Sequence, residues 1–345
     1  MKMTTSKIAE LAGTSRGAVD KTIHGRPGVR PEVRARILQV IEETGYIPLK
    51  DRRCTAPDRP QMVAAIIPRL TNPYFVALKA RLEEVCRTLP GLQLEVYPCD
   101  TTDVPGLLTL LDRLAERSID GLLLRGVKSR RLCDKLNALA LPVIFLDSDV
   151  PGAERLCLVG EDCYKSGRLT ASLLAKSIGF SGQTAVFTGM PEITSHTERL
   201  KGFLDVMRTQ YPGIEVVEQI YTRDQSAVAY ERASHILAEH PALRGICNLA
   251  GCSGEIGRAI FEQRRSRAIP LVCFNTAGDV ADLIRKDIVT FSLSIRPREQ
   301  ARLLLGTMHA YLTAGTRPSA DCLYVPIAIA LDENIESLTE DFGPF

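Results

Sequence analysis

The stretch TTSKIAELAGTSRGAVDKTIHGRPGVRPEVRARILQVIEETGYIP, residues 4–48, decides the organisation of this 345-residue chain. It contains three short patterns in which apolar residues recur at helical spacing. The apolar positions of the three patterns are, in order, Ile8, Leu11 and Ala12; Val19 and Ile23; and Val33, Ile37, Leu38 and Ile41. Three short helices that each have one apolar side predict a small all-α domain over residues 1–49.

A glycine and a capping residue separate the first two patterns. Gly13 interrupts the first helix, and Thr14 or Ser15 supplies the N-cap oxygen of the second. Two helices joined by a short turn that contains a glycine have the spacing of a helix-turn-helix motif. The second helix of that motif enters the DNA major groove by its N-terminal end, which here carries Arg16 and Lys21. Arginine pairs bidentately with guanine, and lysine reaches a base edge or a phosphate.

The charge distribution agrees with this prediction. Residues 1–60 contain twelve Lys/Arg and seven Asp/Glu, a net charge of +5, whereas the other 285 residues contain 31 basic and 34 acidic side chains. A basic head on a mildly acidic body is expected of a protein that binds phosphates. The pattern alone leaves open a three-helix capping domain with solvated basic faces.

The segments KIAELAGTSRGAVDKTI, VRPEVRARIL and ETGYIP resemble the head of the lactose/galactose-repressor (LacI/GalR) family of bacterial transcription regulators. The resemblance runs without a gap, and it implies specific DNA contacts. The implied base-reading residues are Arg16, Gly17 and Lys21, and the implied backbone-contact residues are Thr4, Ser15 and His24. Gly17 has no side chain with which to read a base. Arg30 stands where the family usually has a serine N-cap, a position from which it reaches a phosphate.

Residues 50–61, KDRRCTAPDRPQ, are charged, contain two prolines and have no periodicity, which predicts a linker. In the LacI/GalR family this segment carries a short hinge helix that inserts a leucine into the minor groove. The alanine/leucine pattern of that helix is missing here, and Cys54 and Thr55 stand near the place of the leucine. Arg52 and Arg53 remain available for phosphates or the minor groove.

From Met62 onward, short apolar runs alternate with amphipathic helical patterns, and the series begins again near residue 161. Such alternation predicts parallel sheets with helices on both faces, here as two doubly wound lobes. Ligands of such sheets bind beyond the carboxyl ends of the strands.

This body resembles the periplasmic sugar-binding-protein fold that the LacI/GalR family carries behind its head. The resemblance implies a two-lobed effector-binding and dimerisation domain over residues 62–340, with several crossings between the lobes. We expect lobe 1 to comprise about residues 62–160 and 296–321, and lobe 2 about residues 161–295 and 322–340.

Polar and aromatic residues at the predicted strand ends match sugar-binding positions of that fold. The candidate effector-binding residues are Asn72, Tyr74, Phe75, Arg125, Asp147, Asp149, Ser195, Thr197, Arg199, Gly251, Ser253 and Asn275. The alternative for Asn72 is a helix cap with Tyr74 and Phe75 in the core, and the alternative for one of the two aspartates is a turn cap.

The sequence does not determine whether the effector is charged, because two arginines among the candidates have two interpretations. Arg125 and Arg199 together favour an acidic or phosphorylated sugar, because guanidinium groups pair well with anions. The alternative is an ion pair from Arg125 to Asp147 or Asp149. Ile295 stands where many relatives have a glutamine, so the sequence does not identify the sugar.

Several classes of protein are disfavoured by the sequence. Hydrophobic residues make up 45% of the chain and charged residues 24%, as in globular proteins, and no apolar run is long enough to cross a membrane. The N-terminus has no apolar signal core, so we expect a cytoplasmic location. The ten cysteines form no CxxC pair, and we expect neither a metal nor a cofactor. No nucleophile elbow, P-loop or HExxH motif favours an enzyme.

Two functions remain. A free-standing carbohydrate-binding protein has no need of the basic head. A transcription regulator uses every part of the chain. The resemblance to the LacI/GalR family implies a repressor, and we expect no membrane partner. We expect a homodimer, because paired heads are needed for a palindromic operator in double-stranded DNA and the leucine heptad tail of tetrameric relatives is absent after Leu331. The helices near residues 73–88 and 253–264 are plausible dimer faces.

Overall fold

The computed structural model describes residues 4–23, 28–44, 59–263, 265, 268–276 and 278–342. Helices α1 (Thr5–Leu11), α2 (Arg16–Ile23) and α3 (Pro31–Thr44) lie where the sequence predicts helices. His24, residues 45–49 of the predicted head and residues 50–58 of the predicted linker lie outside the described residues.

The three N-terminal helices share one small core. Its fully buried members include Ile8, Val19 and Ile37. Two of the expected apolar positions are instead exposed, since Leu11 has 49% and Leu38 51% of its surface accessible. Both side chains lie at the edge of the apolar face of their helix. Three short helices enclose too small a core to bury them.

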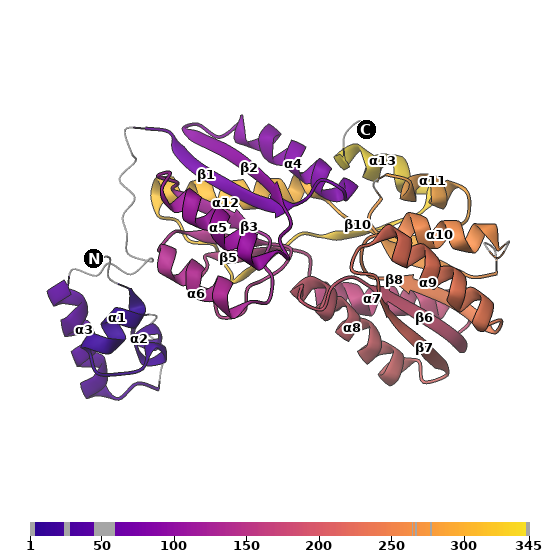
Figure 1. Ribbon diagram of the computed structural model, residues 1–345, viewed down its shortest axis with the longest axis horizontal. Coiled ribbons are helices and arrows are strands. Elements are labelled where there is room, and N and C mark those ends of the chain that lie inside the picture. The colour runs from indigo at the N-terminus through magenta and orange to yellow at the C-terminus, as the bar shows by residue number, and fades with distance from the viewer. Residues whose placement is uncertain are drawn as a thin grey trace.

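Two six-stranded sheets form the body of the chain (Figure 1). The first sheet has the order β2-β1-β3-β4-β5-β11, and all its pairings are parallel. Its strands are β1 (Gln61–Pro68), β2 (Leu92–Cys99), β3 (Gly121–Leu124), β4 (Val143–Leu146), β5 (Cys157–Gly160) and β11 (Cys322–Tyr324). The helices that accompany it are α4 (Pro73–Cys86), α5 (Val104–Ala115), α6 (Arg130–Leu139) and α12 (Pro297–Ala314).

The second sheet has the order β7-β6-β8-β9-β10-β12, parallel except for the antiparallel strand β12. Its strands are β6 (Gly182–Thr188), β7 (Ile214–Tyr221), β8 (Leu243–Asn248), β9 (Leu271–Phe274), β10 (Phe291–Ile295) and β12 (Ile327–Ala330). Its helices are α7 (Cys163–Ser177), α8 (Thr194–Gln210), α9 (Ser226–Glu239), α10 (Ser253–Glu262), α11 (Val280–Arg285) and α13 (Ile335–Thr339). Two short 3-10 turns, Asp332–Asn334 and Glu340–Phe342, flank α13. The predicted two-lobed α/β architecture with two parallel-rich sheets is confirmed.

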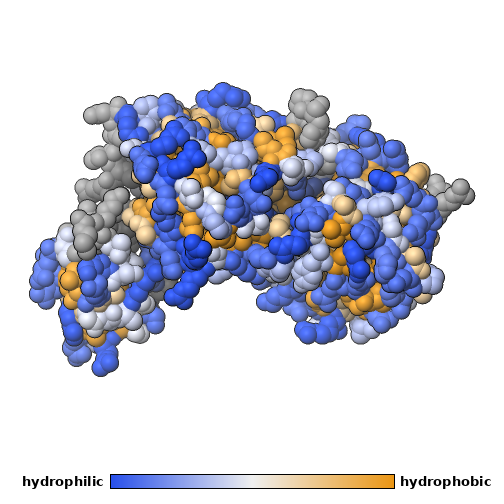
Figure 2. Space-filling view, in the orientation of Figure 1, coloured by the Kyte–Doolittle hydropathy of each residue, from blue (hydrophilic) through white to orange (hydrophobic). Residues whose placement is uncertain are grey.

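Each sheet is buried on both faces, which explains its continuous apolar strands. Along β1, Val63, Ala65 and Ile67 face the core on the side of α4 and α12, whereas Ala64 and Ile66 face the core on the side of α5 and α6. The surface seen in Figure 2 is mainly hydrophilic, with hydrophobic patches interspersed. Within the described residues, no helix combines the length and the apolar character that crossing a bilayer requires.

Three short segments connect the lobes, between β5 and α7, between β10 and α12, and between β11 and β12. Glu161 and Asp162 form the first connection, and Arg296 forms the second. The sequence-based boundary after residue 321 differs from the structure, because Cys322–Tyr324 pairs with β5 in the first sheet. The chain therefore passes to lobe 2 only after β11, a three-residue strand too short for its sheet to be assigned from sequence.

Helices α7 and α8 approach each other almost to backbone contact. A Cβ atom on Gly167 would lie 1.9 Å from the carbonyl oxygen of Arg199, and one on Gly202 would lie 2.0 Å from that of Tyr164. Each glycine therefore admits the backbone of the opposite helix. This reciprocal crossing fixes the position of Arg199, whose side chain belongs to the cleft between the lobes.

We predict that Gly167→Ala destabilises the protein by about 1–3 kcal/mol, because the added methyl group pushes α8 away from α7. The matched control is Gly306→Ala in α12, where a Cβ atom meets no other atom within 4 Å. That change should leave the free energy of unfolding unchanged or raise it by up to about 1 kcal/mol, because alanine has a higher helix propensity than glycine. Urea denaturation measures both, and equal effects of the two substitutions would contradict the close crossing.

Candidate effector-binding cleft

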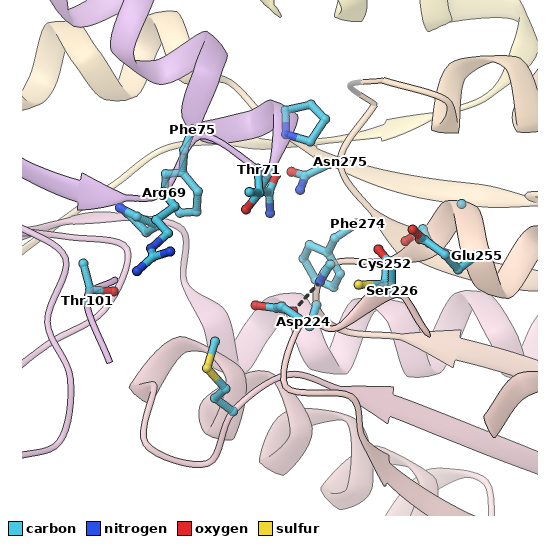
Figure 3. A pocket seen from close by; sticks show the side chains of 18 of the residues that line it. Arg69, Thr71, Phe75, Thr101, Asp224, Ser226, Cys252, Glu255, Phe274 and Asn275 are labelled. Atoms are coloured by element: carbon cyan, nitrogen blue, oxygen red, sulfur yellow. Dashed lines mark hydrogen bonds between the residues drawn. The ribbon is translucent and has the colours of Figure 1, made fainter. Parts of the chain in front are cut away.

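A cavity of about 420 Å³ lies between the two lobes (Figure 3). Its lining comes mainly from the loops that follow the carboxyl ends of parallel strands in both sheets, as expected for doubly wound folds. Lobe 1 contributes Asn72, Phe75 and Arg125, and lobe 2 contributes Gly251, Ser253 and Asn275 among others. The sequence-based site residues from both lobes thus meet in one cavity.

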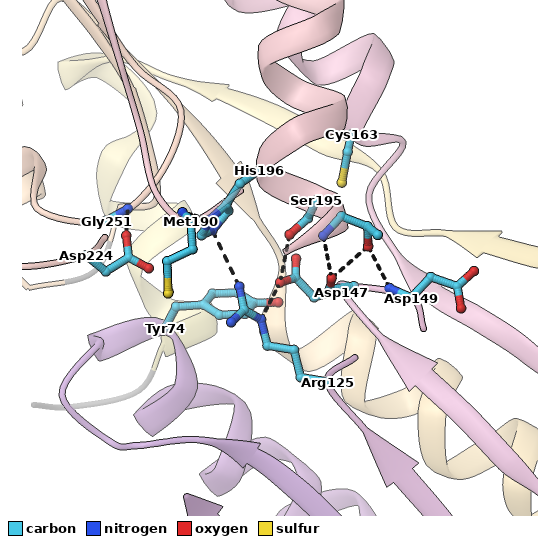
Figure 4. A network of polar contacts seen from close by, with 12 residues as sticks. Tyr74, Arg125, Asp147, Asp149, Cys163, Met190, Ser195, His196, Asp224 and Gly251 are labelled. Carbon is cyan, nitrogen blue, oxygen red and sulfur yellow. Dashed lines mark hydrogen bonds and ion pairs between the residues drawn. The ribbon is translucent and has the colours of Figure 1, made fainter. Parts of the chain in front are cut away.

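A smaller space of about 40 Å³ continues the cavity inward and is lined by charged side chains. Arg125 Nε donates to Asp147 Oδ2 at 3.0 Å, and Arg199 Nη2 lies 3.6 Å from Asp147 Oδ1. Arg199 Nε also donates to Glu161, which is fully buried in the connection between the lobes. Two guanidinium groups therefore face two carboxylates, and Figure 4 shows the pair of Arg125 and Asp147.

Burial and the neighbouring arginines have opposite effects on the pKa values of these carboxyl groups. Burial favours the neutral form of Asp147, but Arg125 and Arg199 more than offset it and hold the pKa of Asp147 below its usual value. Burial raises the pKa of Glu161 above its usual value, and the nearby Asp147 adds to this effect while Arg199 opposes it. Arg199 stays protonated, because these carboxylates raise its pKa despite its burial.

The ion-pair alternative for Arg125 is thus the one that the structure contains, with Asp147 as partner. Neither arginine offers an uncompensated positive charge to the cleft. An effector that binds both guanidinium groups would have to compete with these carboxylates.

Several contacts in the inner part of the cleft join the two lobes. Ser195 Oγ, at the start of α8, lies 3.4 Å from Asp147 Oδ2, and the Arg199 guanidinium reaches the same carboxylate. Beside them, Thr194 Oγ1 and Ser148 Oγ are 2.7 Å apart. These contacts hold the two lobes together at this point.

Aromatic rings line the cleft from both lobes. The guanidinium of Arg125 lies 5.4 Å from the ring centre of Phe75, and that of Arg199 lies 4.4 Å from the ring centre of Phe274. Tyr74 is almost fully buried, and its hydroxyl donates to Gln300. All three rings are buried, and Phe75 and Phe274 line the larger cavity, whereas Tyr74 borders only the inner space.

Other sequence-based candidates have structural as well as cleft-lining roles. Asn72 accepts from the backbone N–H of Tyr74 at 2.9 Å and caps α4. It also lines the cleft, so it has both of the roles expected for it. Ser253 accepts from Asn248 at 2.8 Å, and the Gly251 N–H donates to Asp224 Oδ1 at 3.1 Å. Asn275 carries a buried Oδ1 without a partner among the described residues.

Three candidates do not line the cleft, and they are Ser195, which contacts Asp147, together with Asp149 and Thr197. Asp149 pairs with Arg155 at 3.1 Å and accepts from the backbone N–H of Val150, which makes it the turn-capping aspartate of the pair. Thr197 accepts from Lys128 at 2.9 Å and borders a shallow groove outside the cleft. One turn of α8 separates Thr197 from the cleft-facing side of the helix, and the sequence motif does not reveal that orientation.

The sequence-based set omits further residues at the cleft, among them Glu161, Asp224 and His196. Glu161 lies in the connection between the lobes and pairs with Arg199. Asp224, which follows β7, and His196, which precedes Arg199 by three residues in α8, line the inner space. Burial lowers the pKa of His196 to about 4, which keeps its imidazole neutral near pH 7. The i, i+3 spacing of His196 and Arg199 was a signal that both face one side of α8.

Backbone strain gathers around the cleft. Asp147, Asp224, Cys252 and Asn275 all have positive φ angles, of 61°, 53°, 66° and 70° respectively. Left-handed backbone is uncommon for residues other than glycine and clusters at binding sites. Within the described part of the chain, no group of three or more His, Cys, Asp or Glu side chains is arranged to hold a metal ion.

Comparison with known proteins identifies the body. Residues 63–316 match the family described as "Periplasmic binding protein domain". The sucrose operon repressor of Klebsiella pneumoniae is 29% identical over 208 residues, which cover 59% of this chain and 60% of that repressor. The ribose operon repressor of Bacillus subtilis is 21% identical over 337 residues, which cover 93% of this chain and 97% of that repressor.

Solved structures show the same two-lobed fold. A solute-binding protein of Burkholderia graminis in complex with D-arabinose has a TM-score of 0.76 at 19% identity, covering 82% of this chain and 99% of that one. A glucose-galactose binding protein of Geobacillus stearothermophilus has a TM-score of 0.73 at 20% identity, covering 80% and 99%. The chain belongs to the periplasmic binding protein domain family, and LacI-family repressors are among its relatives, as the resemblance predicts.

Proposed function

We propose that this protein is a DNA-binding transcriptional repressor whose affinity for a palindromic operator is controlled by a small sugar or sugar-derived effector in the cleft. The observation that carries the proposal is the extent of the similarity to the ribose operon repressor, which takes in nearly the whole of both chains. Similarity to a binding protein alone would not require the basic head.

Helices α1 to α3 serve in this proposal as a helix-turn-helix DNA-binding domain. Four residues separate α1 from α2, and among them Gly13 has a φ of +59°, which glycine adopts without strain. Ser15 caps α2 through a bond of 3.3 Å from the N–H of Ala18. Ser15, Gly17 and Lys21 are exposed at this end of the domain, where a major groove would meet them.

The proposed DNA contacts divide into two kinds. Arg16 and Lys21 reach base edges, while Thr4, Ser15 and Arg30 contact phosphates. Thr4 uses its oxygen to accept from the N–H of Lys7 at 3.2 Å, so its hydroxyl hydrogen remains available for a phosphate. Arg16 Nη2 lies 3.0 Å from Glu154 Oε1 of lobe 1, but both side chains are more than one-third exposed. An exposed pair of this kind contributes at most about 1 kcal/mol, so DNA can displace Glu154.

A homodimer would place two heads on the two halves of a palindrome. The faces that we propose for dimerisation are those of α4 and α10. Val76 on α4 is 40% exposed and Phe261 on α10 is 60% exposed, so each helix carries a large apolar side chain on its surface. Burying such side chains against a second copy stabilises a dimer.

The cleft couples the sugar to the heads through lobe closure. A sugar bound between the lobes favours the closed arrangement, in which Asp147 contacts Ser195 and Arg199. It changes the affinity for DNA only to the extent that it binds the closed and open arrangements differently. We infer relief of repression by the sugar, in line with the relatives that are named as operon repressors.

Selection of DNA from a random-sequence library by the purified chain tests the proposed function. A palindromic sequence should be enriched, and neutral sugars should weaken its binding. Retention of random DNA alone, at moderate salt and with or without sugars, would count against a sequence-specific regulator.

We predict that Arg16→Ala costs about 1–3 kcal/mol of binding to the selected palindrome and relaxes the preference at one base pair per half-site. The reason is the loss of a bidentate base contact. Fluorescence anisotropy with the palindrome and with a random duplex of equal length measures both effects. Arg208→Ala, which removes an exposed cation from lobe 2, is the control and should change neither affinity. Equal losses on both duplexes would mean that Arg16 contacts phosphates only.

We predict that Arg199→Met destabilises the protein by about 3–5 kcal/mol and abolishes sugar binding, because it leaves Glu161 buried without its cation. The double variant Arg199→Met/Glu161→Gln should recover most of the stability and none of the sugar affinity. Thermal denaturation and calorimetric titration separate the two effects. Recovery of sugar binding in the double variant would show that Arg199 is only a structural residue.

A further inference from the structure

The backbone around His196 leaves a space that fits its imidazole ring. The side chain is 5% exposed and lies against Gly189, which follows β6. A Cβ atom on Gly189 would lie 2.3 Å from Nδ1 and 2.4 Å from Cε1 of the imidazole. Only a residue without a side chain leaves room for the ring at this point.

The backbone also determines which ring nitrogen carries the proton. The N–H of Met190 donates to His196 Nδ1 at 2.8 Å. A backbone N–H can only donate, so Nδ1 must present its lone pair. Because a neutral imidazole has a single N–H, the proton lies on Nε2.

Nε2 then faces a second donor. The nearest polar atom to which it is directed is Nη2 of Arg125, at 3.4 Å, and a guanidinium group has no acceptor (Figure 4). Arg125 is 4% exposed, and its Nε is occupied by Asp147. Among the described residues, no carboxylate, carbonyl or hydroxyl oxygen forms a hydrogen bond with either of these two facing nitrogens. Two buried donors without an acceptor are costly, and both border the inner part of the cleft.

Two lobe 2 residues that border the same space have the reverse polarity. Asn275 Oδ1 is a buried acceptor without a partner among the described residues. Asp224 faces the same space, with one carboxylate oxygen accepting from Gly251. Because Asp147 and Glu161 already balance Arg125 and Arg199, the carboxylate of Asp224 makes this space net negative.

We propose that His196 and Arg125 form a subsite for one acceptor oxygen of a neutral polyhydroxylated effector, while Asn275 and Asp224 accept from its hydroxyl groups. This inference rests on the proposed function, in which the cleft binds a sugar. It adds His196 as a residue that binds the effector, and it excludes a carboxylate or phosphate at this point, because a second negative group would face Asp224.

Two substitutions separate a ligand contact from a structural role. His196→Asn places an amide oxygen where Nδ1 accepts from Met190, but it does not reach the cleft. His196→Gln reaches the cleft with an amide N–H, but it leaves the Met190 N–H without its acceptor. A structural role makes His196→Gln the more damaging change, whereas a role in binding makes His196→Asn the more damaging change to sugar affinity.

Calorimetric titration of the full chain with neutral pentoses and hexoses, each beside its uronic acid, tests the proposal. We expect a neutral sugar to bind and its uronate to bind at least about tenfold more weakly. His196→Asn should lower the affinity for the neutral sugar about tenfold. His196→Gln should bind the neutral sugar with an affinity within a few-fold of that of the parent protein. Long-range ¹H–¹⁵N spectra of the histidine rings should show the Nε2–H form of His196 before any sugar is added.

Each contrary result has a distinct meaning. Unchanged affinity in His196→Asn, preference for the uronate, or an Nδ1–H ring would overturn this inference and leave the proposed regulator intact. Failure of every sugar to bind would overturn both the inference and the proposed class of effector. Binding to palindromic DNA, measured separately, would still decide whether the chain is a regulator.

Discussion

The buried ion pairs of the cleft are the constraint on which the rest of the structure depends. Arg199 from lobe 2 reaches Glu161 in the connection between the lobes and Asp147 in lobe 1, and Asp147 in turn holds Arg125. Removing a charge from such a chain leaves another buried without compensation. The network therefore joins the two lobes and the connection between them, and the close crossing of α7 and α8 at Gly167 and Gly202 holds Arg199 in place.

The same network limits what the cleft can recognise. Its arginines are matched by carboxylates, so specificity comes from hydrogen-bond polarity and apolar surface more than from net charge. Phe75 and Phe274 supply apolar faces, and Asn275 supplies an acceptor without a partner among the described residues. A neutral ligand rich in hydroxyl groups satisfies this combination.

Much of the fold was predictable, because strand and helix periodicities are strong in the body. The sequence-based helices near residues 73–88 and 253–264 correspond to α4 and α10. Asn72, Phe75, Arg125, Asp147 and Asn275 follow strand ends and therefore meet at the cleft.

The sequence was less informative where function depends on a partner distant along the chain. The ion pair of Arg125 with Asp147 was one of two open alternatives, because spacing does not report which charges meet. His196 and Glu161 carry no motif, and their roles follow from a backbone donor at Met190 and from burial. Leu11 and Leu38 were expected in the core and are exposed, because a three-helix domain has little interior to offer.

The central claim is that a ligand in the cleft controls the affinity of the N-terminal domain for DNA. The most direct measurement is the dissociation constant of the full chain for its selected palindrome, determined by anisotropy over increasing concentrations of a sugar that binds the cleft. The account predicts that DNA affinity changes with sugar concentration and reaches a plateau when the cleft is saturated. A DNA dissociation constant that stays the same while the cleft fills would contradict it.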